Sequence, residues 1–364
     1  PRIPNYFTSQ SIYGADLNDN LLGFNYGLSI LSVEEDRRDV YHSLSNLRFE
    51  KNYIFGDLYL SFVTKDSENK DLDENIEGSG FYLSNTNFFK NWSITTAYRS
   101  MKIDVNDPNI RYNLLDNFGN ALDLQRSPTG YYLHTFRLLS RTIQEVNMND
   151  EIGIEFQISG PLNDNNIVEI NYLKSSSTKK WYQDWNGDWL SEKNSTFPSS
   201  KYSSYPFEET YLEFSGYSDN GDVYYKTGID FQNRVFNVLT NGPEFQSFEI
   251  TKSQTFPFLL SFNANSQWSY DFQLEYQKLK TGFKRKSISD VDGIDDVYSF
   301  HSLLNKNEQI NRFISFSANY DQTWIFSFSF ETTNADESKF NENTNDSFDS
   351  SNSWKSISFS YKFD

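Results

Sequence analysis

The sequence predicts an all-β fold, an antiparallel transmembrane β-barrel with about 14 strands, on three observations. Apolar and polar residues alternate along many short segments, and the connections between these segments are short and long in turn. Tryptophans recur where the segments begin. Successive side chains of a strand point to opposite faces, so each segment has one apolar and one polar face.

The composition agrees with strands and limits the function. Phe, Tyr and Trp make up 18% of the 364 residues, which favours β-structure over helices. The sequence contains no run of about 20 apolar residues, which is the length that would predict a transmembrane helix. With 50 acidic and 32 basic residues the net charge is −18, which argues against nucleic acid as a partner. The absence of cysteine excludes disulfides, thiolate zinc sites and a cysteine nucleophile.

The clearest alternation is "EIGIEFQIS" at 151–159, where Ile152 and Phe156 share a face with two further isoleucines. Such a face can contact lipid or a protein core, and the alternation alone leaves both open. In order along the chain, the predicted strands are 22–33, 39–50, 53–64, 80–89, 92–102, 151–159, 167–175, 208–217, 223–233, 254–264, 268–280, 312–320, 323–332 and 354–363.

The connections separate into two groups by length. One group consists of short inner turns such as "NSQ". The other consists of outer loops, most of them long and several acidic: 65–79, 103–150, 176–207, 234–253, 281–311 and 333–353. Long loops at one rim and tight turns at the other are typical of outer-membrane barrels. We therefore expect residues 22–364 to form the barrel and residues 1–21 to be an N-terminal extension of a mature or excised chain.

The segment 131–143 lies within the long outer loop 103–150. Tyr132, Phe136, Leu139 and Ile143 are spaced as on one helical face, which predicts a helix that folds over the mouth or into the lumen. The alternative is another strand in a differently paired sheet. Fourteen strands could close alone or form most of a larger barrel.

Two sets of residues are predicted from their places on the strands. Trp92, Trp268, Trp324 and Trp354 fall at strand starts and are expected to form aromatic girdles, although tryptophan is common in strands of any kind. The candidate pore-lining residues are Glu151, Glu155, Lys226, Asp230, Asp271 and Glu275. An open pore with this mostly acidic wall would favour cations.

Few residues suggest other chemistry. Asp290, Asp292, Asp295 and Asp296 surround a glycine and are candidate Ca²⁺ ligands, or simply a solvated acidic loop; no other cofactor is expected. The aromatic loop at 184–188 could contact sugars or a protein partner, or form a local cluster. The three histidines, His42, His134 and His301, match no catalytic motif, so we expect no enzymatic activity.

Three segments resemble an uncharacterised barrel family, the DUF6029-type proteins of Bacteroidota and related phyla. They are "LLSRTIQEVNMNDEIGIEFQIS", "YYKTGIDFQNRVFNVLTNGPEFQSFEITKSQTFPFLLSF" and "FQLEYQK", within about 150–364. The resemblance implies a Gram-negative outer-membrane barrel without catalytic residues. It also implies that a segment like "SWKSISFSYKFD" is usually followed by another hairpin.

Together these patterns predict a porin-like transport channel or surface scaffold in the bacterial outer membrane, with unknown cargo. The expected partners are the lipid bilayer, lipopolysaccharide and a protein at the outer loops. The alternative is a soluble or surface-tethered all-β module that binds glycans or proteins.

Overall fold

The computed structural model describes residues 10–35, 39–103, 134–142, 150–183, 189–193, 196–238, 247–285, 304–321, 323–338 and 347–361. No helix in these ranges is long and apolar enough to cross a membrane.

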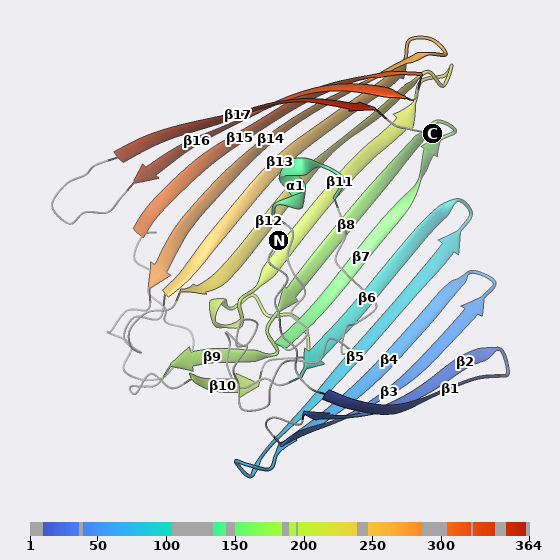
Figure 1. Cartoon of the computed structure of the whole chain (residues 1–364), viewed down its shortest axis with the longest axis vertical. Helices are drawn as coiled ribbons and strands as arrows, with labels where there is room; N and C mark the ends of the chain where they lie inside the picture. The colour runs from blue at the N-terminus through green and yellow to red at the C-terminus, as the bar shows by residue number, and fades with distance from the viewer. Residues whose placement is uncertain are drawn as a thin grey trace.

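One antiparallel sheet of fifteen strands dominates the described residues, and each of its strands pairs with the next strand of the same sheet along the chain (Figure 1). Its strands are β1 (Gln10–Leu21), β2 (Phe24–Glu35), β3 (Val40–Tyr53), β4 (Gly56–Asn69), β5 (Glu74–Phe89), β6 (Trp92–Lys102), β7 (Asp150–Asn163), β8 (Asn166–Ser176), β11 (Phe207–Tyr217), β12 (Val223–Val238), β13 (Ser247–Asn263), β14 (Trp268–Arg285), β15 (Leu304–Tyr320), β16 (Trp324–Ser338) and β17 (Ser347–Tyr361). Outside this sheet lie the hairpin β9 (Lys179–Gln183) and β10 (Trp189–Lys193), the short helix α1 (Arg137–Ser140) and the 3₁₀ turn η3 (Tyr202–Ser204).

All fourteen predicted strands are present in the predicted order, but the expected N-terminal extension 1–21 was wrong for residues 10–21. These residues form β1, which pairs with β2 from Gln10↔Glu35 to Leu21↔Phe24. The pattern was hard to recognise because the polar side of β1 carries small or short residues, such as Gly14 and Asp16, and its apolar side is mixed.

The connections at one end of the sheet are all short, as the sequence predicts, and the longest connections are at the other end. The short-turn end carries 22–23, 54–55, 90–91, 164–165, 218–222, 264–267 and 321–323. The long-loop end carries the others, including 103–149 and 177–206. Several outer loops are nevertheless shorter than predicted, because the strands continue past their apolar segments. The expected loop 65–79, for example, leaves only 70–73 between β4 and β5.

The register assigns every strand residue to one of two faces, since directly paired residues of an antiparallel sheet share a face. We call the side with Glu209, Tyr211 and Glu275 the polar face, and the side with Phe272, Leu274 and Phe316 the apolar face. The large hydrophobic residues of the apolar face are widely exposed, among them Leu28, Phe62, Phe156, Leu212, Phe231, Leu274, Phe316 and Phe328. Most buried polar side chains lie on the polar face, including Asn171, Glu209, Glu275 and Gln277.

Strands β1 and β17 are the two edges of the sheet, and Figure 1 shows them at opposite sides of the curved surface. In an antiparallel meander the strand direction reverses at each step, so the first and the fifteenth strand run in the same direction. Antiparallel closure between these edges therefore requires an odd number of further strands.

The two-residue turn between β1 and β2 has a backbone conformation that can be tested by substitution. Leu22 has φ +55° and Gly23 has φ +75°, the conformation of a type I′ hairpin turn. A leucine in this region costs roughly 1–2 kcal/mol, whereas asparagine tolerates it.

We predict that Leu22→Asn strengthens the β1–β2 hairpin and that Leu22→Val weakens it, because a β-branched residue is least tolerant of positive φ. Hydrogen exchange of the β1 amides measures the effect. Slower exchange is expected for Leu22→Asn and faster exchange for Leu22→Val, and the opposite order would contradict the turn assignment.

Candidate functional site: the polar face and the segment held against it

The six predicted pore-lining residues lie on one face of the sheet. On β7, Glu155 is level with Leu173 of β8, which is level with Glu209 of β11. The pairings of β11 with β12, β12 with β13 and β13 with β14 place Asp230, Lys226, Glu275 and Asp271 on the same face as Glu209. Glu151 shares this face because it lies four residues before Glu155 on β7. Their common polar face is therefore a property of the register, while a lining role in a pore stays a prediction.

Residues 134–142 of the long outer connection rest on this polar face, and Figure 1 shows α1 in front of the strands. The carboxylate of Glu275 accepts hydrogen bonds from the backbone N–H groups of Arg137 (2.8 Å) and Leu138 (2.7 Å). Gln277, two positions further along β14, donates to the carbonyl oxygen of Leu138 at 3.2 Å. One strand thus satisfies polar backbone groups at both sides of the helical turn, where free N–H groups would otherwise remain.

The other side of the turn is held by charge. Arg141 donates two hydrogen bonds to Glu331 of β16, and Nε of Arg137 lies 3.2 Å from the same carboxylate. The guanidinium of Arg137 also lies 5.0 Å from the ring centre of Phe313 on β15. A bidentate pair between arginine and a carboxylate fixes the orientation of both side chains as well as their distance. The helical turn therefore has a defined position on β14–β16.

The start of the segment is anchored on β11. His134 Nε2 lies 2.8 Å from Oε1 of Glu209, and its ring packs edge-on against Tyr211 with centroids 4.6 Å apart. Phe136 is buried against Tyr211 and Leu139, with Leu259 beside them. Aromatic packing and a histidine–carboxylate contact therefore hold the segment where β11 and β12 meet.

The polar face also compensates charge away from this segment. Arg99 on β6 and Glu151 on β7 form a buried pair, with Nε 2.7 Å from Oε1. Lys226 Nζ lies 2.8 Å from Glu213, which also accepts a hydrogen bond from the Tyr211 hydroxyl. Glu155 instead accepts a hydrogen bond from Asn171 at 3.0 Å. Buried charges persist when they are paired and hydrogen-bonded in this way.

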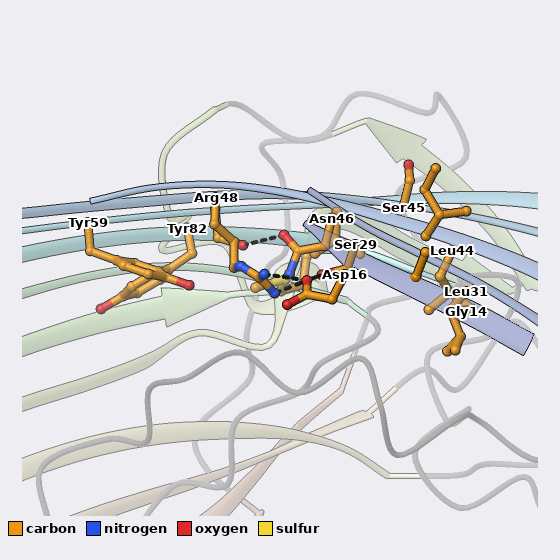
Figure 2. Close-up of a pocket in the computed structure, with 16 residues that line it drawn as sticks. Gly14, Asp16, Ser29, Leu31, Leu44, Ser45, Asn46, Arg48, Tyr59 and Tyr82 are labelled. Atoms are coloured by element: carbon orange, nitrogen blue, oxygen red, sulfur yellow. Dashed lines mark hydrogen bonds and ion pairs between the residues drawn. The ribbon is translucent and has the colours of Figure 1, made fainter. Parts of the chain in front are cut away.

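A cavity of about 550 Å³ opens on the polar face of β1–β6 (Figure 2). Arg48 extends across it and contacts Asp16 Oδ1 at 2.6 Å and Ser29 Oγ at 2.8 Å. Tyr59 and Tyr82 lie together in the same cavity with their ring centres 5.9 Å apart. Strands β1–β6 thus line a cavity, whereas the 134–142 segment lies against β11 and β14–β16.

Three of the four predicted girdle tryptophans begin strands at the short-turn end, on the apolar face: Trp92, Trp268 and Trp324. Trp268 belongs to an aromatic cluster with Tyr270 and Tyr320, at centroid distances of 6.0 and 4.9 Å. The placement of Trp354 was wrong. Strand β17 begins at Ser347, and Trp354 is level with Glu331, so it lies on the polar face.

The connection after β8 covers part of the apolar face near the long-loop end. Tyr98 donates to the carbonyl oxygen of Thr196, and the rings of Tyr202 and Tyr205 pack on Phe248 of β13. The apolar face is therefore partly covered by this connection near the long-loop end. The predicted aromatic loop 184–188, His301 and the candidate Ca²⁺ ligands Asp290, Asp292, Asp295 and Asp296 lie outside the described residues.

The sequence did not single out Glu209, Glu331 or Arg141 as site residues. Glu331 directly follows the apolar alternation of β16, which was the available signal, whereas Glu209 lies between Glu208 and Thr210 and gave none. The partners of both carboxylates come from a loop far away in the chain. Tertiary pairing of this kind cannot be read from strand periodicity alone.

Comparison with known proteins finds only distant similarity. No family model and no curated protein matches the chain, so the resemblance to the DUF6029-type family stays a prediction. Among solved structures, a bacterial polysaccharide outer membrane secretin is 8% identical, with 98% of this chain and 91% of that chain covered and a TM-score of 0.30. In-vitro folded OmpT, an outer membrane protein of Vibrio cholerae, is 7% identical, with 97% and 95% covered and a TM-score of 0.32. Both are outer-membrane proteins, but values this low define neither a family nor a function for this chain.

We predict that Glu275→Ala releases the 134–142 segment from the polar face. The substitution removes the acceptor for two backbone N–H groups, and hydrogen bonds to a charged group contribute about 1.5–3 kcal/mol each. Amide hydrogen exchange at Arg137 and Leu138 should accelerate.

Asp271→Ala is the matched control, because Asp271 lies on the same strand and face but bonds Ser261 and Asn319 instead. It should leave exchange in 134–142 unchanged. Equal exchange in wild type and Glu275→Ala would show that Glu275 does not hold the segment.

Proposed function

We propose that this chain is a transmembrane β-barrel protein of the bacterial outer membrane and acts as a channel whose lumen is narrowed by the 134–142 segment. The observation that carries the proposal is the inverted distribution of polarity. Large apolar side chains are exposed on one face of the sheet, while charged and amide side chains are buried on the other. A water-soluble sheet buries its apolar face, whereas a barrel in lipid exposes it.

The extent of the apolar band supports a membrane span. On β14 the apolar face runs from Trp268 to Tyr276 and then reaches Lys278. On β15 the same band ends where Arg312 pairs with Tyr276. Nine tilted residues at about 3.3 Å each reach roughly the 25 Å height of the lipid-facing band of known barrels. The aromatic cluster around Trp268 would then sit at the boundary between lipid and water.

The polar face would line the lumen. It carries Glu155, Glu169 and Asp271, which accept hydrogen bonds from the neutral side chains of Asn171, Gln157 and Ser261. Acidic side chains in a water-filled passage raise the local concentration of cations. The cavity beside Arg48 and Asp16 provides space on the polar face of β1–β6, away from the strands that the 134–142 segment contacts.

Closure of the barrel is part of the proposal. An open sheet edge in lipid would leave backbone N–H and C=O groups without partners, so both edges must be paired in the membrane. Because β1 and β17 run in the same direction, either a parallel pair or an odd number of further strands would join them.

The soluble binding module remains the competing function, and detergent extraction separates the two. We expect the protein to require detergent for release and to migrate differently on SDS gels before and after boiling. A protein that stays soluble without detergent and migrates identically in both samples would exclude the membrane barrel.

We predict that Leu274→Lys destabilises the protein in lipid vesicles by about 2–4 kcal/mol, since a lysine near mid-bilayer must lose its hydration. Gln273→Lys, one residue away on the polar face, is the matched control and should have a much smaller effect. Equilibrium unfolding by denaturant in vesicles measures both variants. Similar losses for the two would mean that the faces do not differ in environment.

We also predict cation selectivity from the acidic polar face. Protein reconstituted in a planar bilayer under a salt gradient should give a reversal potential of the sign for cation preference, and Asp271→Asn should reduce it. Anion preference would overturn this lining, and the absence of any conductance would favour a scaffold over a channel.

A further inference from the structure

Three metal-binding side chains meet where the 134–142 segment touches the sheet. They are His134 from the segment, Glu209 from β11 and Asp230 from β12, and one potential ligand atom of each lies within 4.8 Å of the others. All three residues are buried. The sequence separates them by up to 96 positions, so only the fold brings them together.

Asp230 is the most informative member of this cluster. Its side chain is 0% exposed, and neither carboxylate oxygen accepts a hydrogen bond within the described part of the chain. A buried carboxylate needs a proton, a hydrogen-bond donor or a cation to offset its lost hydration. One oxygen of Asp230 lies within 4.8 Å of the ligand atoms of His134 and Glu209, so a compensating cation would lie among these three atoms.

The neighbouring groups supply no such cation in the contacts that the structure defines. Gln232 donates to Glu209 at 2.8 Å but carries no charge. Thr255 is level with Asp230 on β13 and is neutral. On the same face, Lys226 is bonded to Glu213, and Arg99 is bonded to Glu151. The cluster therefore combines two carboxylates and an imidazole without a basic side chain among its ligands.

We propose that His134, Glu209 and Asp230 bind a divalent transition-metal ion, of the zinc class, that fastens the 134–142 segment to the sheet. One nitrogen and two carboxylate oxygens suit Zn²⁺ and its first-row neighbours, whereas Ca²⁺ and Mg²⁺ prefer oxygen ligands only. Two carboxylates neutralise the charge of the ion. Three protein ligands leave a fourth position for water.

The geometry requires little rearrangement. Ligands at about 2.0–2.2 Å from a tetrahedral zinc ion lie about 3.3–3.6 Å from one another. His134 Nε2 and Glu209 Oε1 are 2.8 Å apart, so the two side chains would separate slightly on binding. The ion would then replace one hydrogen bond by three coordinate bonds that join the loop segment to two strands.

The test uses the untagged full-length protein, purified in detergent and stripped with EDTA. Isothermal titration with Zn²⁺ should show one equivalent bound, and Co²⁺ should give the absorption of a low-symmetry site. His134→Ala and Asp230→Asn should weaken Zn²⁺ binding by more than about 100-fold, beyond what is lost when a residue that only hydrogen-bonds to a metal ligand is removed. His42→Ala and Asp271→Asn, which change a buried histidine and a carboxylate elsewhere on the polar face, should bind as wild type does.

A second measurement on the wild-type chain guards against variants that fail to fold. Cleavage by trypsin after Arg137 or Arg141 should slow when Zn²⁺ is added and return when EDTA is added, because a bound ion would add coordinate bonds to the contacts that already hold the segment. Absence of both Zn²⁺ binding and protection in the wild type would overturn the proposal and leave a proton shared by Glu209 and Asp230. Binding that survives His134→Ala would overturn it as well. Neither result depends on whether the barrel conducts ions.

Discussion

The alternation of faces in an unbroken antiparallel sheet is the constraint on which the rest of the structure depends. A shift of one residue in any strand would move all its apolar side chains to the polar face. The described pairings change register at only two places, between Pro161 and Asn163 and between Thr281 and Phe283, both close to strand ends. The polar face and the apolar face are therefore continuous over all fifteen strands, and residues as distant in the chain as Asp16 and Glu331 lie on the same face.

This continuity explains why the polar face can hold a separate segment of chain. Glu209, Glu275 and Glu331 come from three strands, yet all point to the side from which residues 134–142 approach. Each carboxylate binds a different part of the segment: the histidine ring at its start, the N–H groups of α1 and the arginine beyond it. A helix of four residues is not stable by itself, so the conformation of the segment depends mainly on the hydrogen-bond acceptors that the sheet places beside it.

The sequence predicted the strands because most have a mixed environment, one side apolar and one side polar. It failed where that contrast fades. In β1 the polar side carries the apolar Ile12 beside small or short residues such as Gly14 and Asp16. Beyond Thr332 strand β16 is polar on both sides, so its end resembled a loop. Trp354 was misplaced for the same reason, because the first residues of β17 show no alternation from which to count.

The cluster of His134, Glu209 and Asp230 was out of reach for a different reason. Periodicity places Glu209 and Asp230 on a face, but their diagonal relation requires the β11–β12 register, in which Tyr211 rather than Glu209 is opposite Asp230. The position of His134 requires the path of the outer loop. Local sequence rules give faces and turns, whereas a three-residue site across two strands and a loop depends on register and on tertiary contacts together. In the structure, Asp230 reveals the site, because a buried carboxylate without a hydrogen bond among the described residues is costly. Its surroundings must offset that cost. The loop segment that covers it supplies the third ligand rather than a positive charge, which makes coordination a physically sufficient way to keep segment and sheet together.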